Sequence, residues 1–250
     1  MADDDYLDAI DYTKDTLDVE DLEDVKYAVR LEDVSRIYKI GKVEIVALIG
    51  VNIIIDKGDF VVVSGKSGSG KTTLLNIIGA IDVATSGRVF VMDVPINDYD
   101  ESFRSTFRLD NTGFIFQSYN LVSTLTAVVN VMFPMQLSPK SESELREEAT
   151  KLLEHVEMGH RIDHLPWQLS SGEQQRVAIA RAMANDPPII LADEPTANLD
   201  GDSGQMIREL LFKLNEQGKT VIVMTHDEGL INREGIHHFT MKNGELSLNV

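Results

Sequence analysis

The spacing of apolar positions changes several times along the chain, and each change predicts a different kind of element. Short β-branched runs separated by glycines predict strands joined by tight turns at residues 25–31, 43–49, 51–55 and 60–64. Residues 71–78 form a helix-favouring run, and residues 88–92 predict another strand. The first part of the chain is therefore expected to be rich in strands and to contain one helix.

Helical spacing replaces the strand pattern between about residues 120 and 186. Apolar side chains recur every three or four positions in residues 143–158, and glutamates lie near the start of that run. The chain then returns to alternation, with a strand at 189–192, a helix at 203–217 and a strand at 220–225. Continuously apolar strands that alternate with helices indicate a mostly parallel sheet. We therefore expect an α/β core with an inserted helical subdomain at about residues 118–186.

Composition narrows the class of protein. The chain has 250 residues, 43% hydrophobic content, no cysteine and a formal net charge of −18. This is enough apolar material for a sizeable core, and the negative charge argues against a nucleic-acid partner. No apolar run is long enough to span a bilayer, and the N-terminus lacks a secretory pattern, so we expect a cytoplasmic protein.

Half of the charge imbalance lies at the N-terminus. Residues 1–26 carry eleven acidic and two basic side chains. Such a run with few aromatic residues is typical of a solvated acidic arm. The alternative is an acidic helix that docks through its apolar side chains, namely Tyr6, Leu7, Ile10, Leu17 and Leu22.

A glycine-rich loop carries the clearest chemical signal. It follows the strand predicted at 60–64, precedes a helix, and matches the eight-residue Walker A pattern with Gly65, Lys66, Ser67, Gly68, Ser69, Gly70, Lys71 and Thr72. Glycines let backbone N–H groups approach phosphate oxygens that a Cβ would obstruct. Lys71 would bring its charge to the β- and γ-phosphates, and Thr72 would bind Mg²⁺. Thr73 is also expected to bind ATP. The pattern does not require Lys66, which can contact phosphate or simply be solvated.

Two adjacent carboxylates end the apolar strand at 189–192. Asp193 is expected to hold Mg²⁺ through water, and Glu194 to activate the attacking water as general base. Both can approach one phosphate site because the chain leaves the pleat at the end of a strand. Acidic residues commonly end strands, so this pair indicates a hydrolytic site only in combination with the phosphate loop.

Further motifs resemble those of ABC ATPases, in the order which that family requires, over residues 27 to about 245. Residues 169–176 resemble the signature motif, Gln117 the Q-loop, residues 197–200 the D-loop, His226 the switch histidine, and Tyr38 the aromatic that stacks on adenine. Details of residues 76–79, 120–121 and 188–196 look most like the subgroup of lipoprotein-release and macrolide- or peptide-export systems. Taken singly, Tyr38, Gln117, His226 and Asp200 also have structural interpretations, as a half-buried aromatic, a surface amide, a strand cap and a helix-starting carboxylate.

The resemblance implies a fold, partners and roles. The fold would be a P-loop NTPase core of mostly parallel sheet, with an antiparallel β subdomain and the helical insertion, over residues 27–250. Two subunits would sandwich two ATP molecules head to tail and drive an integral membrane transporter, so the protein would be peripheral on the inner face of the cell membrane. Glu194, His226 and Gln117 would be catalytic, with Gln117 also near Mg²⁺. Ser170, Gly172 and Glu173 would reach the ATP of the opposite subunit, and Asp200 would serve dimer communication.

The signature motif departs from the usual family pattern at two positions. Ser171 replaces a glycine, and Glu173 replaces a glutamine. Ser170 to Glu173 also fit a capping box, in which the glutamate reaches back to the first amide of the helix. A helix N-terminus is a good receptor for phosphate, and a carboxylate beside it would oppose the incoming anion.

The apolar stretch 121–137 has two interpretations. It can pack in the core, or part of it, around Phe133 and Met135, can form an exposed groove for a helix of the membrane partner. The function itself has a rival, a regulatory module that binds ATP and a membrane protein without moving cargo. Soluble ABC proteins of translation or DNA repair are disfavoured, because they need a second cassette or long coiled coils.

Overall fold

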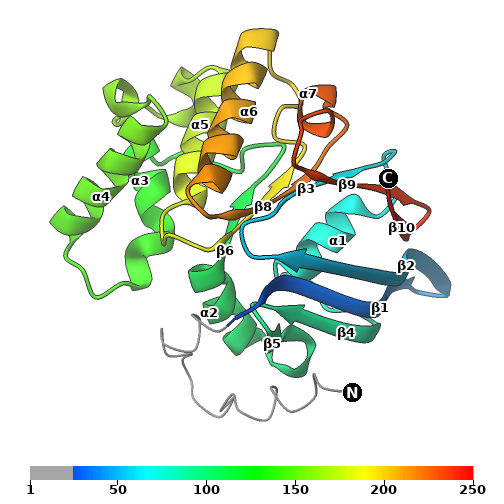
Figure 1. The fold of residues 1–250 in the computed structure, drawn as a ribbon. Coiled ribbons are helices and arrows are strands. Elements are labelled where there is room, and N and C mark those ends of the chain that lie inside the picture. The colour runs from blue at the N-terminus through cyan, green and yellow to red at the C-terminus, as the bar shows by residue number, and fades with distance from the viewer. Residues whose placement is uncertain (1–24, 250) are drawn as a thin grey trace.

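The computed structural model describes residues 25–249, which build two β-sheets and the helices around them (Figure 1). The predicted acidic arm therefore lies outside the described residues, apart from Val25 and Lys26. The first sheet is antiparallel, with strand order β2-β1-β4-β5. Its strands are β1 (Tyr27–Ile40), β2 (Val43–Asp56), β4 (Ser86–Val91) and β5 (Val94–Pro95).

Strand β2 corrects one expectation from the sequence. Residues 43–49 and 51–55 were expected to be separate strands, but they form one strand of 14 residues. Gly50 has a φ of 53° and donates its N–H to Ser35 Oγ over 2.9 Å. The pairing with β1 shifts register at this point, between Val34 opposite Val51 and Arg36 opposite Leu48. Gly50 therefore forms a bulge within the strand and not a turn between two strands.

The second sheet has the strand order β10-β9-β3-β8-β7-β6. Every pair in it is parallel except β9 with β10. The strands are β3 (Phe60–Ser64), β6 (Thr112–Ile115), β7 (Ile189–Asp193), β8 (Thr220–Met224), β9 (His237–Lys242) and β10 (Glu245–Leu248). The expectation of a mostly parallel sheet is confirmed, although β6, β9 and β10 were not predicted.

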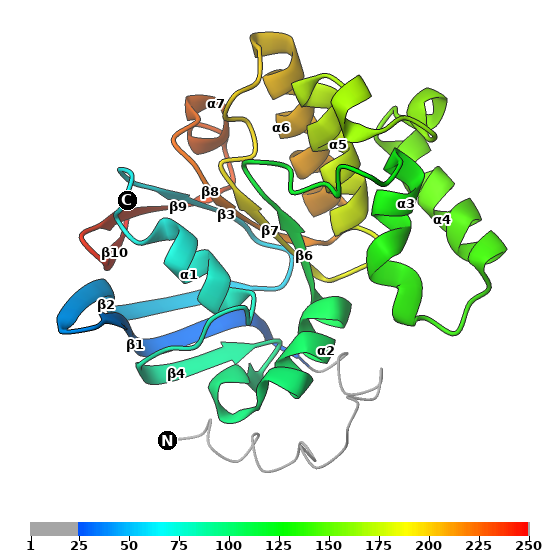
Figure 2. The ribbon, with the colours of Figure 1, turned by 180° about the vertical axis from the view of Figure 1, so that it is seen from behind.

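Both faces of β3, β7 and β8 are buried, which explains why these strands are continuously apolar. Side chains alternate between two core clusters along these three strands, as a pleated strand requires. In β3, Val61 and Val63 join the cluster shared with the antiparallel sheet, while Val62 joins the cluster under the helical region. Helix α1 (Lys71–Ile78) lies between the two sheets (Figure 1 and Figure 2).

Most of the other helices lie on the opposite face of the parallel sheet, away from the antiparallel sheet (Figure 2), whereas residues 101–111 pack with the cluster shared with the antiparallel sheet. The α-helices are α2 (Glu101–Asn111), α3 (Ala127–Met132), α4 (Glu142–His155), α5 (Ser171–Ala182), α6 (Gly201–Glu216) and α7 (Glu228–Ile231). Short 3₁₀ helices are η3 (Ile96–Asp98), η4 (Phe133–Leu137), η5 (Gly159–Arg161) and η6 (Pro166–Gln168). Within residues 25–249, no helix has the length and apolar character needed to cross a membrane.

The apolar stretch 121–137 divides between the two interpretations. Val128, Val131 and Met135 are buried in the core, and Met135 is only 2% exposed. Phe133 is 61% exposed and Leu137 is 82% exposed. Met135 therefore follows the core interpretation and Phe133 the exposed one, because the tight turn of η4 directs the two side chains to different sides.

Candidate active site

The glycine-rich loop between β3 and α1 closes tightly on its surroundings. A Cβ on Gly65 would lie 2.4 Å from the carbonyl oxygen of Met241, and one on Gly70 would lie 2.5 Å from that of Ala47. Gly70 also has a φ of 113°, which L side chains rarely adopt. The loop can therefore take this path only with glycine at these two positions.

Lys71 begins α1 and is only 8% exposed. Its ammonium group donates to the carbonyl oxygens of Gly65, over 2.6 Å, and of Lys66, over 3.3 Å. Its Nζ also lies 3.7 Å from Glu194 Oε1. The positive charge is thus held over the loop, between the backbone and the carboxylate that follows β7.

Thr72 and Asp193 meet across the site from different elements. The Thr72 hydroxyl donates to Asp193 Oδ2 over 2.7 Å. Burial raises the pKa of Asp193, and the neighbouring charge of Glu194 adds to this, while the Thr72 hydrogen bond opposes it. A carboxylate in this setting gains from a nearby cation, because the cation offsets the cost of burying its charge.

Glu194 and His226 form a second contact at the same edge of the sheet. Glu194 Oε2 lies 3.0 Å from His226 Nδ1. The chain leaves β7 at Glu194, whose φ is 46° and whose N–H donates to the Met224 carbonyl over 2.7 Å. This left-handed conformation turns Glu194 toward the site beside Asp193, and such strained backbone often occurs at functional sites.

A cavity of about 750 Å³ unites these groups. Most predicted site residues of the same chain line it: Gly65, Lys66, Ser67, Gly68, Gly70, Lys71, Thr72, Thr73, Gln117, Asp193, Glu194 and His226. Three apolar residues of β2, namely Ile45, Val46 and Ala47, also line it and were missed, since short aliphatic strands carry no motif. Ser69 and Tyr38 are not among its lining residues.

The signature residues lie at the start of α5, apart from this cavity. Ser170 and Glu173 form the expected capping box, in which Glu173 Oε2 accepts from the Ser170 N–H over 2.8 Å. This backbone hydrogen bond is the main cause that lowers the pKa of Glu173. Arg161 Nε lies 3.3 Å from Glu173 Oε1 and partly offsets its charge.

The signature and the D-loop are neighbours in one chain. Asp200 is the N-cap of α6 and accepts from the Ser203 N–H over 2.8 Å. A Cβ on Gly172 would lie 2.6 Å from Ser203 Oγ, so the starts of α5 and α6 are in close contact. Gly172 is therefore needed for packing, whatever its role toward a ligand.

Two side chains beside the site make contacts that the sequence did not predict. Asp227 accepts from the Thr196 hydroxyl over 2.7 Å and from Arg208 over 2.9 Å, directly after His226. Burial opposes the ionisation of Asp227, but these hydrogen bonds outweigh it and hold its pKa below the usual range. Gln175, buried in α5, donates to the Pro195 carbonyl over 2.9 Å. Sequence spacing could not reveal these contacts, because their partners come from other elements.

Comparison with known proteins decides the family. A family model described as ABC transporter matches residues 48–197. The chain belongs to the ABC transporter family. This ABC protein is an ATP-binding ATPase, as the motifs predicted, and its fold is that of an ABC ATPase cassette.

Its relatives agree with the expected subgroup. The ABC chain is 47% identical over 223 residues to an uncharacterised ABC transporter ATP-binding protein of Methanocaldococcus jannaschii, MJ0796, covering 87% of this chain and 94% of that protein. It is 43% identical over 205 residues to the macrolide export ATP-binding/permease protein MacB of Hyphomonas neptunium, covering 82% of this chain and 32% of that protein.

A solved structure matches closely. It is the dimeric structure of a post-hydrolysis state of the ATP-binding cassette MJ0796 bound to ADP and Pi. The TM-score is 0.82 at 46% identity, and the match covers 88% of this ABC chain and 96% of that chain.

Proposed function

We propose that this ATPase works as a head-to-tail dimer that encloses two ATP molecules and drives an integral membrane transporter. The observation that carries the proposal is the convergence of Lys71, Glu194 and His226 around one cavity at the end of a parallel sheet. The signature residues lie outside that cavity, so a second copy must supply them to complete the site. The dimeric MJ0796 structure supports the same arrangement.

The residues divide the chemical work. The loop amides and Lys71 bind the phosphates, since Lys71 can exchange the carbonyl oxygens of Gly65 and Lys66 for phosphate oxygens. Glu194 accepts a proton from the attacking water. His226 contacts the γ-phosphate, and Asp227 fixes the turn that presents it.

The site also fits Mg²⁺. Thr72 Oγ1 and Asp193 Oδ2 lie 2.7 Å apart, and hydroxyl and carboxylate oxygens are the ligands that this ion prefers. Gln117 lines the same cavity. Bound Mg²⁺ would supply positive charge against the phosphates, and Thr72, Asp193 and Gln117 are the residues that would hold it, Asp193 through water.

Glu173 is expected to weaken the dimer. In the dimer its carboxylate would face the γ-phosphate of the opposite subunit, and like charges repel. We predict that Glu173→Gln tightens ATP-dependent dimerisation by about threefold, a small effect because Arg161 already offsets part of the charge. The amide retains an oxygen for the capping box, so folding is preserved.

The measurement is the ATP concentration that gives half-maximal dimer in analytical ultracentrifugation. Glu144→Gln is the matched control, since Glu144 occupies the same capping-box position in α4 and the proposal assigns it no phosphate contact. An unchanged or higher ATP requirement for Glu173→Gln would contradict the assigned position of this carboxylate.

A second cavity offers a site for the membrane partner. It has a volume of about 420 Å³ and is lined by Ile81, Phe116, Asn120 and Phe133, among others. Phe116 and Asn120 flank Gln117, which lines the nucleotide cavity. A helix of the partner seated here would therefore be next to the residue that senses nucleotide. Through this partner the ATPase would be peripheral on the inner face of the cell membrane and serve an export or lipoprotein-release system.

Docking at this groove makes Phe133 a test position. We expect Phe133→Asp to reduce co-purification of an integral membrane partner from solubilised host membranes by at least about tenfold, because a charge would be buried in an apolar contact. ATP binding by the isolated chain should be unchanged, since Phe133 lies outside the nucleotide cavity.

Leu248→Asp is the control, because Leu248 is 57% exposed on β10, outside the groove. Equal recovery of the partner with both variants would refute docking at Phe133. A partner that binds but moves no cargo in a transport assay would favour the rival regulatory function.

A further inference from the structure

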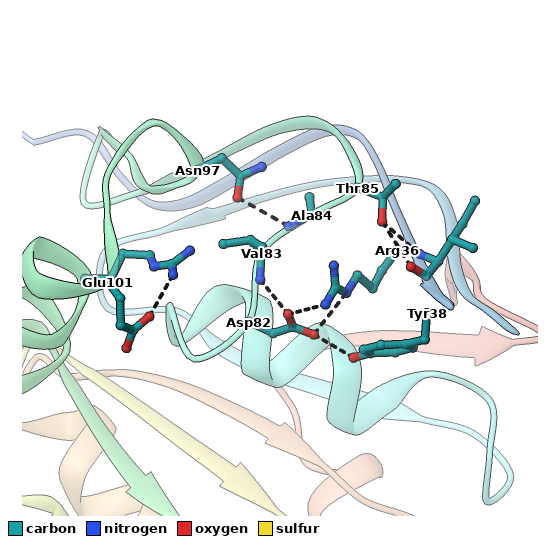
Figure 3. Close-up of polar contacts among 10 residues, drawn as sticks. Arg36, Tyr38, Asp82, Val83, Ala84, Thr85, Asn97 and Glu101 are labelled. Carbon is teal, nitrogen blue, oxygen red and sulfur yellow. Dashed lines mark hydrogen bonds and ion pairs between the residues drawn. The ribbon is translucent and has the colours of Figure 1, made fainter. Parts of the chain in front are cut away.

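Tyr38 belongs to a compact polar cluster at the end of β1 (Figure 3). Its hydroxyl donates to Asp82 Oδ2 over 2.6 Å. The guanidinium of Arg36 donates to both oxygens of Asp82, over 3.1 and 2.6 Å. The same guanidinium lies over the Tyr38 ring, 4.5 Å from its centroid. The ring is thus held at its hydroxyl and covered on one face.

Asp82 itself is fixed to the backbone around it. Its Oδ1 accepts from the Val83 N–H over 2.8 Å, and its own N–H donates to the Asn76 carbonyl in α1 over 3.1 Å. The loop that follows is joined to β1, because the Ile37 N–H donates to Thr85 Oγ1 over 2.9 Å. Asp82 therefore connects the end of α1 with the strand that carries Tyr38.

Tyr38 lies next to a residue that lines the nucleotide cavity. Tyr38 is directly opposite Ile45 in the antiparallel pairing, and residues opposite each other share one face of a sheet. Ile45 lines the cavity. A base bound against Ile45 and Val46 would therefore be close to the face of Tyr38 that Arg36 leaves uncovered.

We propose that Asp82 and Arg36 are positioning residues that hold the Tyr38 ring for stacking on the nucleotide base. This inference rests on the proposed function. A ring with a fixed rotamer loses less conformational freedom when the base binds, so the base is bound more tightly. Helix α1 begins at Lys71, and its Asn76 carbonyl accepts from the Asp82 N–H. The same helix therefore also sets the distance between the base site and the phosphate site.

The Arg36–Asp82 pair is suited to this task. An exposed ion pair contributes little, but the two side chains are only 20% and 19% exposed and their contact is bidentate. Removing Asp82 leaves both a hydroxyl and a guanidinium without their shared acceptor. The ring is then free to leave its position, since Arg36 alone gives it no directional contact.

The experiment is calorimetric titration of the full chain with ADP, which has a base, and with pyrophosphate, which has none. We expect Asp82→Ala to weaken ADP binding by about tenfold, the value of a lost charged hydrogen bond, and to leave pyrophosphate binding unchanged. Tyr38→Phe, which keeps the ring but loses the hydroxyl, should weaken ADP binding in the same direction. In a Tyr38→Ala background, Asp82→Ala should cause no further loss, because the residue acts through the ring.

Glu44→Ala is the matched control. Glu44 pairs with Lys39 over 3.1 Å on the same hairpin, and both neighbour the Tyr38–Ile45 pair on the other face. Its ADP affinity should equal that of the unmodified chain. Asp82→Asn keeps the shape of the side chain and covers the case in which Asp82→Ala fails to fold; it should also weaken ADP selectively.

The outcomes separate this inference from the function on which it rests. Unmodified chain that bound neither ADP nor pyrophosphate would contradict the proposed function. Normal ADP binding by Asp82→Ala and Asp82→Asn, or an equal loss of ADP and pyrophosphate, would overturn only the positioning role. A further loss in the Tyr38→Ala background would also overturn it.

Discussion

Replacing Glu194 by glutamine is expected to stop phosphate release while ATP binding continues. The amide keeps the size of the side chain but cannot accept the proton of the attacking water, so turnover should fall by about 100-fold or more. Lys71 and the loop amides, which bind the phosphates in the proposal, are unchanged. ATP should therefore accumulate between two subunits, and a stable dimer should appear in size-exclusion chromatography with ATP.

Phosphate release in a steady-state assay is the deciding measurement. Glu228→Gln is the control, because Glu228 is an exposed carboxylate of α7, two residues after His226, and does not line the cavity. Continued turnover by Glu194→Gln at the rate of this control would show that another group activates the water.

Removal of Lys71 is expected to abolish detectable nucleotide binding. Its ammonium group is nearly buried above the loop, so its charge acts on phosphate with little screening by solvent. Lys71→Ala also leaves the partly buried Glu194 carboxylate without the Lys71 ammonium group. The unpaired carboxylate would then repel the incoming phosphates. Together these effects should raise the dissociation constant for ATP by at least about 100-fold.

Calorimetric titration with ATP in the presence of EDTA measures this loss without hydrolysis. Lys213→Ala, at an exposed position in α6, removes an equal charge far along the chain from the loop and should bind normally. Retained affinity in Lys71→Ala would mean that the loop amides alone bind the phosphates.

The sequence predicted best where one local pattern determines the structure. Residues 60–64 and 71–78 were predicted with the bounds they have as β3 and α1, because an apolar run, a glycine loop and a helix start follow one another. Prediction from the sequence failed where contacts with residues distant in the chain determine the structure. Gly50 was expected to break a strand, but pairing with β1 carries β2 through it as a bulge.

The same distinction applies to the site residues. Motifs located the lining residues of the phosphate loop and the two carboxylates at the end of β7, because each motif is a run of consecutive residues. They could not predict the contacts of Asp82, Asp227 or Gln175, which depend on how separate elements pack. Nor could helical periodicity separate Met135 from Phe133, since a single turn of 3₁₀ helix places one inside and the other outside.

The bond from Gln175 to the Pro195 carbonyl ties the signature helix to the segment that follows Glu194 in the same chain. In the proposed twofold assembly, each copy would offer its α5 to the neighbour's ATP and its Glu194 to its own ATP. A shift of α5 caused by one ATP would thus be transmitted through this hydrogen bond to Glu194, which would activate water at the other ATP. Hydrolysis at the two ATP molecules would then be coupled, and neither subunit would hydrolyse ATP independently of the other.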